Sequence, residues 1–381
     1  MTARYLTKDE LIHALELRDL SCASQGEHAM QMLLSQGQAA IESWLPCTTQ
    51  TLKANPLVWA QENYDALGYP KDGPAREARY TRYLNDQLML RTQMSSHVPQ
   101  WLKSWSGSLP SYRLLMCPGL VYRRDCIDRW HCAEPHQLDM WLLTDKNARS
   151  KALLPNMVQR LLTAWLPNHS YCTIESPHPY TDDGIQMDVR LHKGPDQSQE
   201  SEWIEIGEAG WIAEDLLQRM GLDPKRWSGV ALGVGLDRIL MLRKGIPDIR
   251  LLRNTEPRVA MQMQDLSPWQ NVSKQPKIER DLSVAVPIDL DEDTLGDQIR
   301  TSLGSAAEWI EVVQVLSEAD YLSLPQTALH RLGMHPDQKN WLLRLIIRHP
   351  TETLTNQQAN ELRNQVYQAV HQGQRQQWAS N

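Results

Sequence analysis

Two short segments, far apart in the chain, each place an arginine beside structure suited to holding phosphate. The first runs from Tyr122 to Asp125 and leads on to Pro135-His136-Gln137. The second is a glycine-rich run from Gly229 to Gly235 that ends in Asp237-Arg238. Glycines let the backbone approach a ligand closely, and the N-terminus of the helix expected after Asp237 favours anions. Arginine adds a permanent planar charge that can fork onto phosphate oxygens, so the two segments together predict a nucleotide site.

The elements that must position these segments follow from periodicity and from helix and strand breakers. Residues 7–45 are expected to be helical, opening with a capping box at Thr7 to Glu10, and residues 46–75 to form an irregular linker. A long amphipathic segment is expected at 80–102. Polar loops and one helix separate the expected short strands, and the alternation favours an α+β fold, an antiparallel sheet flanked by helices, over repeated βαβ units. The strands are expected at 112–117, 119–124, 138–143, 187–192 and 203–206, and the helix at 149–166.

Composition places the chain among globular proteins. Its 381 residues, of which 41% are hydrophobic and 22% charged, can bury two or three ordinary cores. No apolar stretch is long enough to span a bilayer and the N-terminus lacks the apolar centre of a signal peptide, so we expect a cytoplasmic protein. The six cysteines form no CxxC pair and are expected to be reduced. Cys126, His131 and Cys132 lie close in sequence, but their spacing and the missing fourth ligand argue against structural zinc.

At these residues the chain resembles the class II aminoacyl-tRNA synthetases, and among them the phenylalanyl enzymes. Residues 121–131 with His136-Gln137 are similar to that family's motif 2, and residues 90–96 (Leu-Arg-Thr-Gln-Met-Ser-Ser) to its Leu-Arg-Thr-His-Thr-Ser segment. Residues 229–238 resemble its motif 3. Residues 276–372 resemble the ferredoxin-fold anticodon-binding domain of the same enzymes.

The resemblance covers roughly residues 76–372 and implies a domain organisation. An N-terminal helical or linker region is expected at 1–75. The class II catalytic domain, an antiparallel sheet flanked by helices, is expected at 76–272. A ferredoxin-like α+β domain that reads the anticodon is expected at 273–381. The implied partners are therefore tRNA and an amino acid, with no membrane, while oligomeric state and a partner subunit stay open.

The resemblance also implies roles in an ATP site. Arg123 would contact the α-phosphate, and Arg238 would hold the distal phosphates or cover the adenine. Magnesium would bridge the phosphates, with Glu205 as the protein contact. The other residues implied at this site are Asp125, His131, Gly233 and Gly235. A surface ion pair with Asp125 is the alternative for Arg123, and an ordinary structural carboxylate is the alternative for Glu205.

For the amino acid, the resemblance places the α-ammonium contacts at Ser95, Gln137 and Asp139, where Asp139 replaces a glutamate. The walls of the side-chain pocket depart from the family, because residues with weaker ring-pairing ability stand where it has phenylalanines, although the small residue Ala231 is retained. The pattern therefore supports an amino acid substrate better than phenylalanine itself. The implied wall positions are His178, Tyr180, Val230 and Leu232.

The net charge of the C-terminal region does not decide whether the chain binds tRNA. Residues 276–381 carry nine Lys and Arg against fourteen Asp and Glu, a net of −5, so phosphate contacts require a local basic patch. The acidic run from Asp289 to Asp293 is expected to be a solvated surface turn. The residues expected to form the basic patch are Arg280, Arg331, Lys339, Arg344 and Arg348.

The chain contains no phenylalanine, and Trp and Tyr supply its aromatic volume. The absence of phenylalanine has two explanations. It results either from compositional drift or deliberate replacement, or from a need to translate this protein when phenylalanine is scarce. Three function classes remain: a single-chain synthetase, a paralogue that passes its adenylate to a carrier protein or small molecule, and a non-catalytic sensor. The two arginines argue against the sensor, and the C-terminal domain favours tRNA as acceptor.

Overall fold

The structure, a computed structural model, describes residues 5–78, 80–103, 112–191, 202–272 and 276–375. The chain divides into two compact units. The core unit comprises residues 1–123, 134–246 and 261–269, and the C-terminal unit comprises residues 124–133, 247–260 and 270–381. The described residues 5–75, expected to be a helical or linker region, cluster with the core unit.

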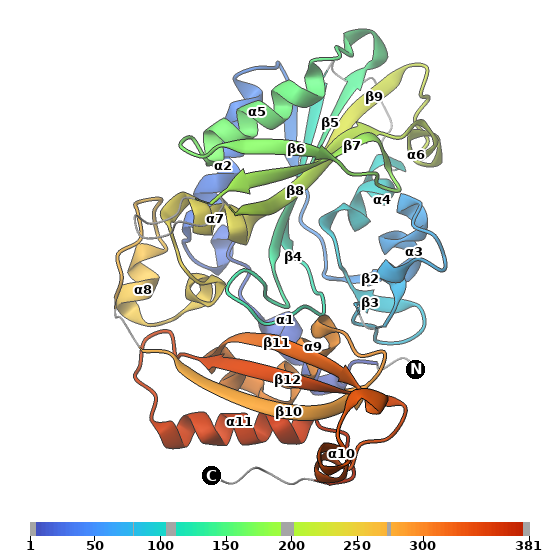
Figure 1. Cartoon of the computed structure of the whole chain (residues 1–381). Coiled ribbons are helices and arrows are strands. Elements are labelled where there is room, and N and C mark those ends of the chain that lie inside the picture. The colour runs from blue at the N-terminus through green and yellow to red at the C-terminus, as the bar shows by residue number, and fades with distance from the viewer. Residues whose placement is uncertain (1–4, 79, 104–111, 192–201, 273–275, 376–381) are drawn as a thin grey trace. The chain divides into compact units, whose positions relative to one another are not determined.

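A seven-stranded sheet organises the core unit, in the order β1-β4-β5-β9-β8-β7-β6 (Figure 1). Neighbouring strands are antiparallel except at one edge, where β1 runs parallel to β4 and Thr48 pairs with Arg113. The expected antiparallel sheet is therefore confirmed apart from that edge. The strands are β1 (Thr48–Thr51), β4 (Tyr112–Leu120), β5 (His136–Asp145), β6 (Tyr171–Glu175), β7 (Thr181–Arg190), β8 (Trp203–Ile212) and β9 (Trp227–Gly235), and β2 (Leu57–Trp59) pairs separately with β3 (Leu88–Leu90).

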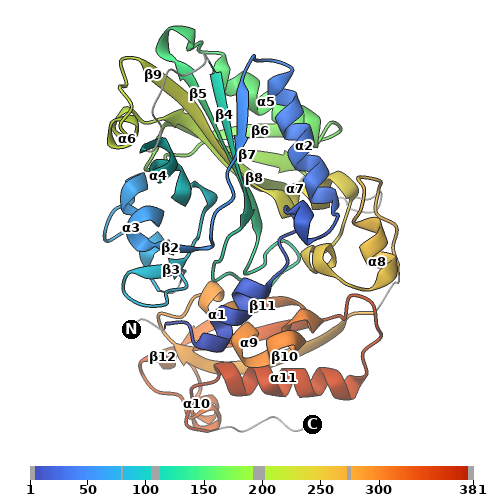
Figure 2. The ribbon, with the colours of Figure 1, turned by 180° about the vertical axis from the view of Figure 1, so that it is seen from behind.

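Three helices, α2 (Ala29–Glu42), α5 (Leu153–Trp165) and α7 (Leu236–Lys244), lie together along one face of this sheet (Figures 1 and 2). Gly37 makes the close packing of α2 and α5 possible, because a Cβ there would lie 2.7 Å from the Trp165 ring. The other helices of the core unit are α1 (Lys8–Glu16), α3 (Ala60–Asn63), α4 (Val98–Lys103) and α6 (Glu214–Arg219). Helix α8 (Pro257–Gln262) contains the sequence boundary between the two units, which falls after Ala260.

The N-terminal third is more broken than its periodicity predicts. The expected helix at 7–45 is two helices, although the capping box of Thr7 and Glu10 is present as predicted. The expected linker at 46–75 contains β1, β2 and α3, and its Tyr64 is 1% exposed. The segment at 80–102 is not one amphipathic element: β3 is followed by a 3-10 turn at Met94–His97 and then by α4. Tertiary packing here overrides local periodicity.

Three antiparallel strands form the sheet of the C-terminal unit, in the order β10-β12-β11. Helices α9 and α11 cover one face and enclose a core that includes Val284, Ile299 and Val366 (Figure 2). The elements are β10 (Ile278–Pro287), α9 (Glu292–Leu303), β11 (Ile310–Asp320), α10 (Gln326–Leu332), β12 (Gln338–Ile347) and α11 (Asn356–Val370). With α10 as an insertion, this is the β-α-β-β-α part of a ferredoxin-like fold, and no closing strand follows α11 within residues 276–375.

The loop 124–133 belongs to the C-terminal unit although β4 and β5 of the core unit flank it in the chain. Its Ile127 is 7% exposed within the core of that unit, and the Ile127 carbonyl accepts a hydrogen bond from Val313 N at 3.0 Å. The acidic run at 289–293, expected to be merely solvated, contributes the N-cap of α9, because Asp291 accepts from Thr294 N. Among the described residues no helix has the length and apolarity to cross a bilayer.

Candidate active site

One face of the core sheet carries most of the predicted polar residues. Antiparallel partners lie on the same side of a sheet, and Gln137, Asp139 and Trp141 of β5 pair with Gly235, Gly233 and Ala231 of β9. We call this the site face. Gly233 leaves space above Asp139, because a Cβ there would lie 3.2 Å from the Asp139 Oδ1.

The two motif arginines, Arg123 and Arg238, act on a common carboxylate, that of Glu205. Arg123 follows β4 and donates from Nε to the carbonyl of Thr92 at 2.9 Å. Arg238, in the first turn of α7, donates from Nη1 to the carbonyl of Glu205 at 2.8 Å. Burial raises the pKa of Glu205, and both arginines oppose this rise. The structure thus brings Arg123, Glu205 and Arg238 together.

A β-bulge shapes the acidic group around Glu205. Met187 pairs with Gly207 but the next residue, Asp188, pairs with Glu205, so β8 carries an extra residue there. Bulges re-aim side chains, and Glu208 and Asp188 both raise the pKa of Glu205. Burial raises the pKa of Glu208 as well, but hydrogen bonds from His178 and Ser176 outweigh it and leave that pKa below its usual value.

Asp139 is the buried acid of the site face. It is 5% exposed, and burial raises its pKa from 3.8 to about 6 although the Ser95 hydroxyl and amide and the charge of Arg123 oppose the rise. The Oε1 of Gln137 is also buried, and no hydrogen-bond donor reaches it within the part of the chain that the structure describes. The Gln137 Oε1 thus lacks a matching donor on the same face as the Asp139 carboxylate, and a bound ammonium group would supply one.

Aromatic rings stand next to this acid. The rings of Trp141 and Tyr180 stack with centroids 6.1 Å apart, and Tyr69 lies 6.2 Å from Tyr180. Burial, and then the neighbouring acid groups that include Asp139, raise the pKa of Tyr180 well above its usual value. Ala231 and Trp141 belong to one apolar cluster against which Tyr180 and Tyr69 pack. His178 touches this group, with its ring 5.9 Å from Tyr180, and pairs with Glu208 at 2.5 Å.

Two predicted wall residues, Val230 and Leu232, are not on the site face. They alternate with Ala231 along β9, so their side chains point to the opposite side of the sheet. Both are fully buried, yet neither belongs to the cluster that contains Ala231 and Trp141. The structure therefore does not bring them together with Ala231, and Trp141 with Tyr69 takes the place beside Tyr180 that they were expected to fill.

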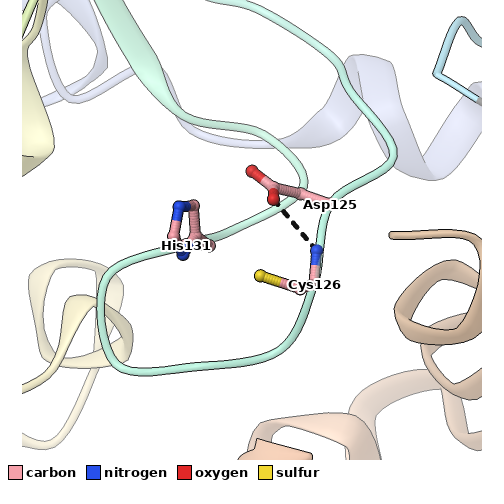
Figure 3. Close-up of side chains that lie close together, drawn as sticks. All are labelled: Asp125, Cys126 and His131. Carbon is pink, nitrogen blue, oxygen red and sulfur yellow. Dashed lines mark hydrogen bonds between the residues drawn. The ribbon is translucent and has the colours of Figure 1, made fainter. Parts of the chain in front are cut away.

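Asp125 and His131, expected to contact ATP, belong to the C-terminal unit. They lie in the loop 124–133 beside Cys126 (Figure 3). Asp125 Oδ1 accepts from Cys126 N at 2.9 Å, and His131 Nδ1 lies 2.8 Å from Asp128 Oδ2. Cys132 is not in this group; its sulfur accepts from Arg253 Nη1 at 3.8 Å.

The five basic residues expected to form one tRNA patch do not share a face. Along β12, Lys339 is buried with the helix-covered side, whereas Arg344 alternates onto the other side and Arg348 follows the end of the strand. Arg280 contacts Asn356 and Asn360 of α11, and Arg331 lies on α10. Three of them form ion pairs within the unit: Arg344 with Asp281 at 2.8 Å, Lys339 with Glu318 at 3.1 Å and Arg348 with Glu311 at 3.0 Å.

Four residues of the site face or its border were missed: Tyr69, Gln93, Trp141 and Glu208. Gln93 accepts from the Tyr69 hydroxyl at 2.9 Å and donates to the Asn63 carbonyl at 2.6 Å. Of the four, only Glu208 could have been predicted from the sequence. It lies three residues after Glu205, and paired acids on a strand suggest a charged site. Tyr69 lies in a segment without periodicity, so nothing local marked it.

Comparison with known proteins bears on the family of the chain. The family model described as tRNA synthetases class II core domain (F) matches residues 23–263. The phenylalanine–tRNA ligase alpha subunit of Enterococcus faecalis is 33% identical over 192 residues, 49% of this chain and 55% of that protein. The corresponding subunit of Clostridium beijerinckii is 34% identical over 221 residues, 55% of this chain and 61% of that protein.

The chain thus spans little more than half the length of these relatives. A crystal structure of pyrrolysyl-tRNA synthetase from Desulfitobacterium hafniense superposes with a TM-score of 0.44 at 17% identity, covering 60% of this chain and 75% of that one. The family match covers more than half of the chain and includes β1 through β9. The chain therefore belongs to the family of class II tRNA synthetase core domains.

Proposed function

We propose that the chain activates an aromatic amino acid with ATP and transfers the aminoacyl group to tRNA. One observation carries the proposal: on a class II sheet, Arg123 and Arg238 act on the same carboxylate, that of Glu205. A site for a polyphosphate requires fixed positive charges, and Arg123 and Arg238 supply two of them around Glu205.

The chemistry is an in-line displacement at the α-phosphate by the carboxylate of the amino acid. Positioning and electrostatic stabilisation dominate such a step. Arg123, held by the Thr92 carbonyl, stabilises the charge that develops on the α-phosphate. Arg238, anchored on the Glu205 carbonyl at the start of α7, holds the distal phosphates or covers the adenine. Gly233 and Gly235 leave β9 without side chains at the two positions that pair with Asp139 and Gln137.

The acidic group also fits magnesium. Glu205, Glu208 and Asp188 offer the hard carboxylate oxygens that this ion prefers, and burial followed by repulsion from the other two acids raises the pKa of Glu205. When bound, the ion would neutralise charge on the phosphates of ATP. Glu205 is the residue that we propose holds it.

The amino acid binds at Asp139. The Asp139 carboxylate and the Gln137 Oε1 accept from the α-ammonium, and Ser95 orients the carboxylate. Trp141, Tyr180 and Tyr69 provide aromatic surface beside it, and ring pairs of this kind contribute about 0.5–1.5 kcal/mol each. Ala231 limits the depth. This supports phenylalanine or a close aromatic analogue as substrate.

The family and the C-terminal unit support transfer to tRNA. The relatives are named alpha subunits, so a second subunit is one possible partner, but this chain continues into an α+β unit of its own. One observation favours a second acceptor class, a carrier protein or small molecule: Arg344, Lys339 and Arg348 are paired with acids inside their unit. Such pairs must open before these residues bind phosphate.

The experiment is ATP–pyrophosphate exchange by the full chain with phenylalanine, tyrosine and leucine, followed by charging of unfractionated tRNA. We expect exchange with an aromatic amino acid and attachment to tRNA through an ester that is stable in acid and cleaved in mild alkali. Arg160→Ala serves as a matched control, since Arg160 stacks on Trp44 away from the site face. Exchange without charging selects the second acceptor class, and no exchange with any amino acid contradicts the proposal.

A further inference from the structure

The loop 124–133 gathers three side chains of the types that bind transition metals (Figure 3). A carboxylate oxygen of Asp125, the sulfur of Cys126 and a ring nitrogen of His131 all lie within 4.8 Å of one another. All three residues are partly buried. The ligand atoms of a tetrahedral zinc site lie about 3.5 Å apart, so closing by about 1 Å would form three of its corners.

A fourth side chain, Asp128, supports the histidine. Its Oδ2 lies 2.8 Å from His131 Nδ1, and its Oδ1 accepts from the backbone amides of Trp130 and His131 at 2.6 and 2.8 Å. A carboxylate that bonds one ring nitrogen of a histidine orients the other nitrogen toward a metal and makes it a better ligand. Asp128 Oδ2 is also 3.9 Å from Cys126 Sγ.

Acidic side chains gather around Cys126. Asp128 Oδ2 lies 3.9 Å from its sulfur, and a carboxylate oxygen of Asp125 lies within 4.8 Å of it. These carboxylates would attract a cation bound at the sulfur.

The backbone that carries these ligands is held in place within the C-terminal unit. Arg300 of α9 donates to the carbonyls of Asp125 and Cys126. Gly296 lies against the same stretch, because a Cβ there would be 2.5 Å from the Asp125 carbonyl oxygen. Ligands on a fixed backbone lose little entropy on binding, which favours a site over a chance cluster.

We infer that this loop binds a divalent transition metal of the zinc class through Asp125, Cys126 and His131. Thiolate and imidazole ligands select zinc or cobalt over magnesium and calcium. Three protein ligands leave a fourth position for water or another ligand. The site requires no nucleotide, so it stands independently of the proposed function.

The experiment is a titration of the full chain, freed of metal with a chelator, with Co²⁺ as a spectroscopic substitute for zinc. We expect one equivalent to produce a sulfur-to-cobalt charge-transfer band with the intense visible bands of tetrahedral cobalt, and Zn²⁺ to displace them. No such bands in the wild-type protein overturn the inference, whether or not any variant folds.

Variants locate the site. Cys126→Ser should abolish the charge-transfer band. Asp125→Asn and His131→Asn should weaken Zn²⁺ binding at least about 10-fold, since even an outer residue costs about 10- to 100-fold. Cys132→Ser is the matched control, a neighbouring cysteine outside the group, and should leave the band intact. A band that survives Cys126→Ser, or is lost with Cys132→Ser, places the metal elsewhere and contradicts the assignment.

Discussion

The imidazole of His136 joins the start of β5 to the start of α7, because its Nδ1 lies 3.1 Å from Oδ1 of Asp237. Leu20 N donates to Nε2 at 3.0 Å, so Nδ1 carries the proton and donates to the carboxylate. His136 N donates to the other oxygen of Asp237. Both side chains are buried, and the pair fixes the two segments that carry Gln137 and Arg238.

This pair should be coupled energetically. We expect His136→Ala and Asp237→Asn each to destabilise the protein, with a coupling energy of about 1–3 kcal/mol in a double-mutant cycle of chemical unfolding, because either single change removes the buried bond between the imidazole and the carboxylate. Thr144→Val, at a buried polar position farther along β5, is the control for general damage to that strand. Additive effects of the two changes would argue against the coupling.

We expect Arg123→Ala and Arg238→Ala each to reduce kcat/KM for pyrophosphate exchange at least roughly 30-fold. This corresponds to a loss of about 2 kcal/mol of transition-state stabilisation, because each change removes a preorganised charge. Circular dichroism checks the fold of each variant. Near-normal exchange by folded variants would remove these residues from the reaction.

The raised pKa of Asp139 predicts that the stability of the protein depends on pH. Its pKa in the folded protein is about 6 against an ordinary 3.8, so its contribution to stability is fully present below about pH 4 and is lost as the pH rises through 6. Asp139→Asn should therefore stabilise the protein at pH 8, by on the order of 2–3 kcal/mol, and have little effect at pH 4. Urea unfolding at the two pH values measures this, and equal effects at both would contradict the buried acid.

The same residue governs binding. Only the ionised carboxylate attracts the α-ammonium, so amino acid affinity should increase from pH 5 to pH 8 with a midpoint near 6. Calorimetric titration measures it. In Asp139→Asn this pH dependence should disappear and binding should be weak throughout.

Ala231→Gly should admit ring-substituted amino acids that the parent rejects, since it removes a methyl group beside Trp141 at a cost of about 1 kcal/mol in packing. Val230→Ala is the matched control: it deletes more volume one residue away, but on the opposite side of the sheet. Competition between phenylalanine and para-substituted analogues measures the change. A shift of preference in Val230→Ala and none in Ala231→Gly would contradict the assignment of the site face.

Gly296→Ala tests the position of the loop 124–133. Glycine to alanine within a helix normally stabilises by about 1 kcal/mol, but here the added methyl would lie 2.5 Å from the Asp125 carbonyl oxygen. We expect destabilisation and faster proteolysis within the loop. Ser302→Ala, on an exposed turn of α9, should be neutral. Stabilisation by Gly296→Ala would show that the loop lies elsewhere.

The sequence alone predicts the family and part of the candidate site. The order of the motifs predicted the family, and Arg123, Glu205 and Arg238 do lie together. The two-residue period of a strand is enough to separate Val230 from Ala231, and Lys339 from Arg344. The first pair is grouped only by the family resemblance and the second only by its charge, and neither argument takes the alternation into account. Tyr69 and the bulge beside Glu205 depend on tertiary contacts, which no local pattern encodes.

The membership of residues 124–133 in the C-terminal unit bears on how such a protein can arise. Arg300 and Gly296 hold a loop that lies, in the chain, inside the core fold. A C-terminal domain acquired by gene fusion could not act as an interchangeable appendage, since replacing it would leave Ile127 without its apolar surroundings. The two coding regions are therefore expected to evolve in step, with changes at Ile127 or Asp125 compensated in α9.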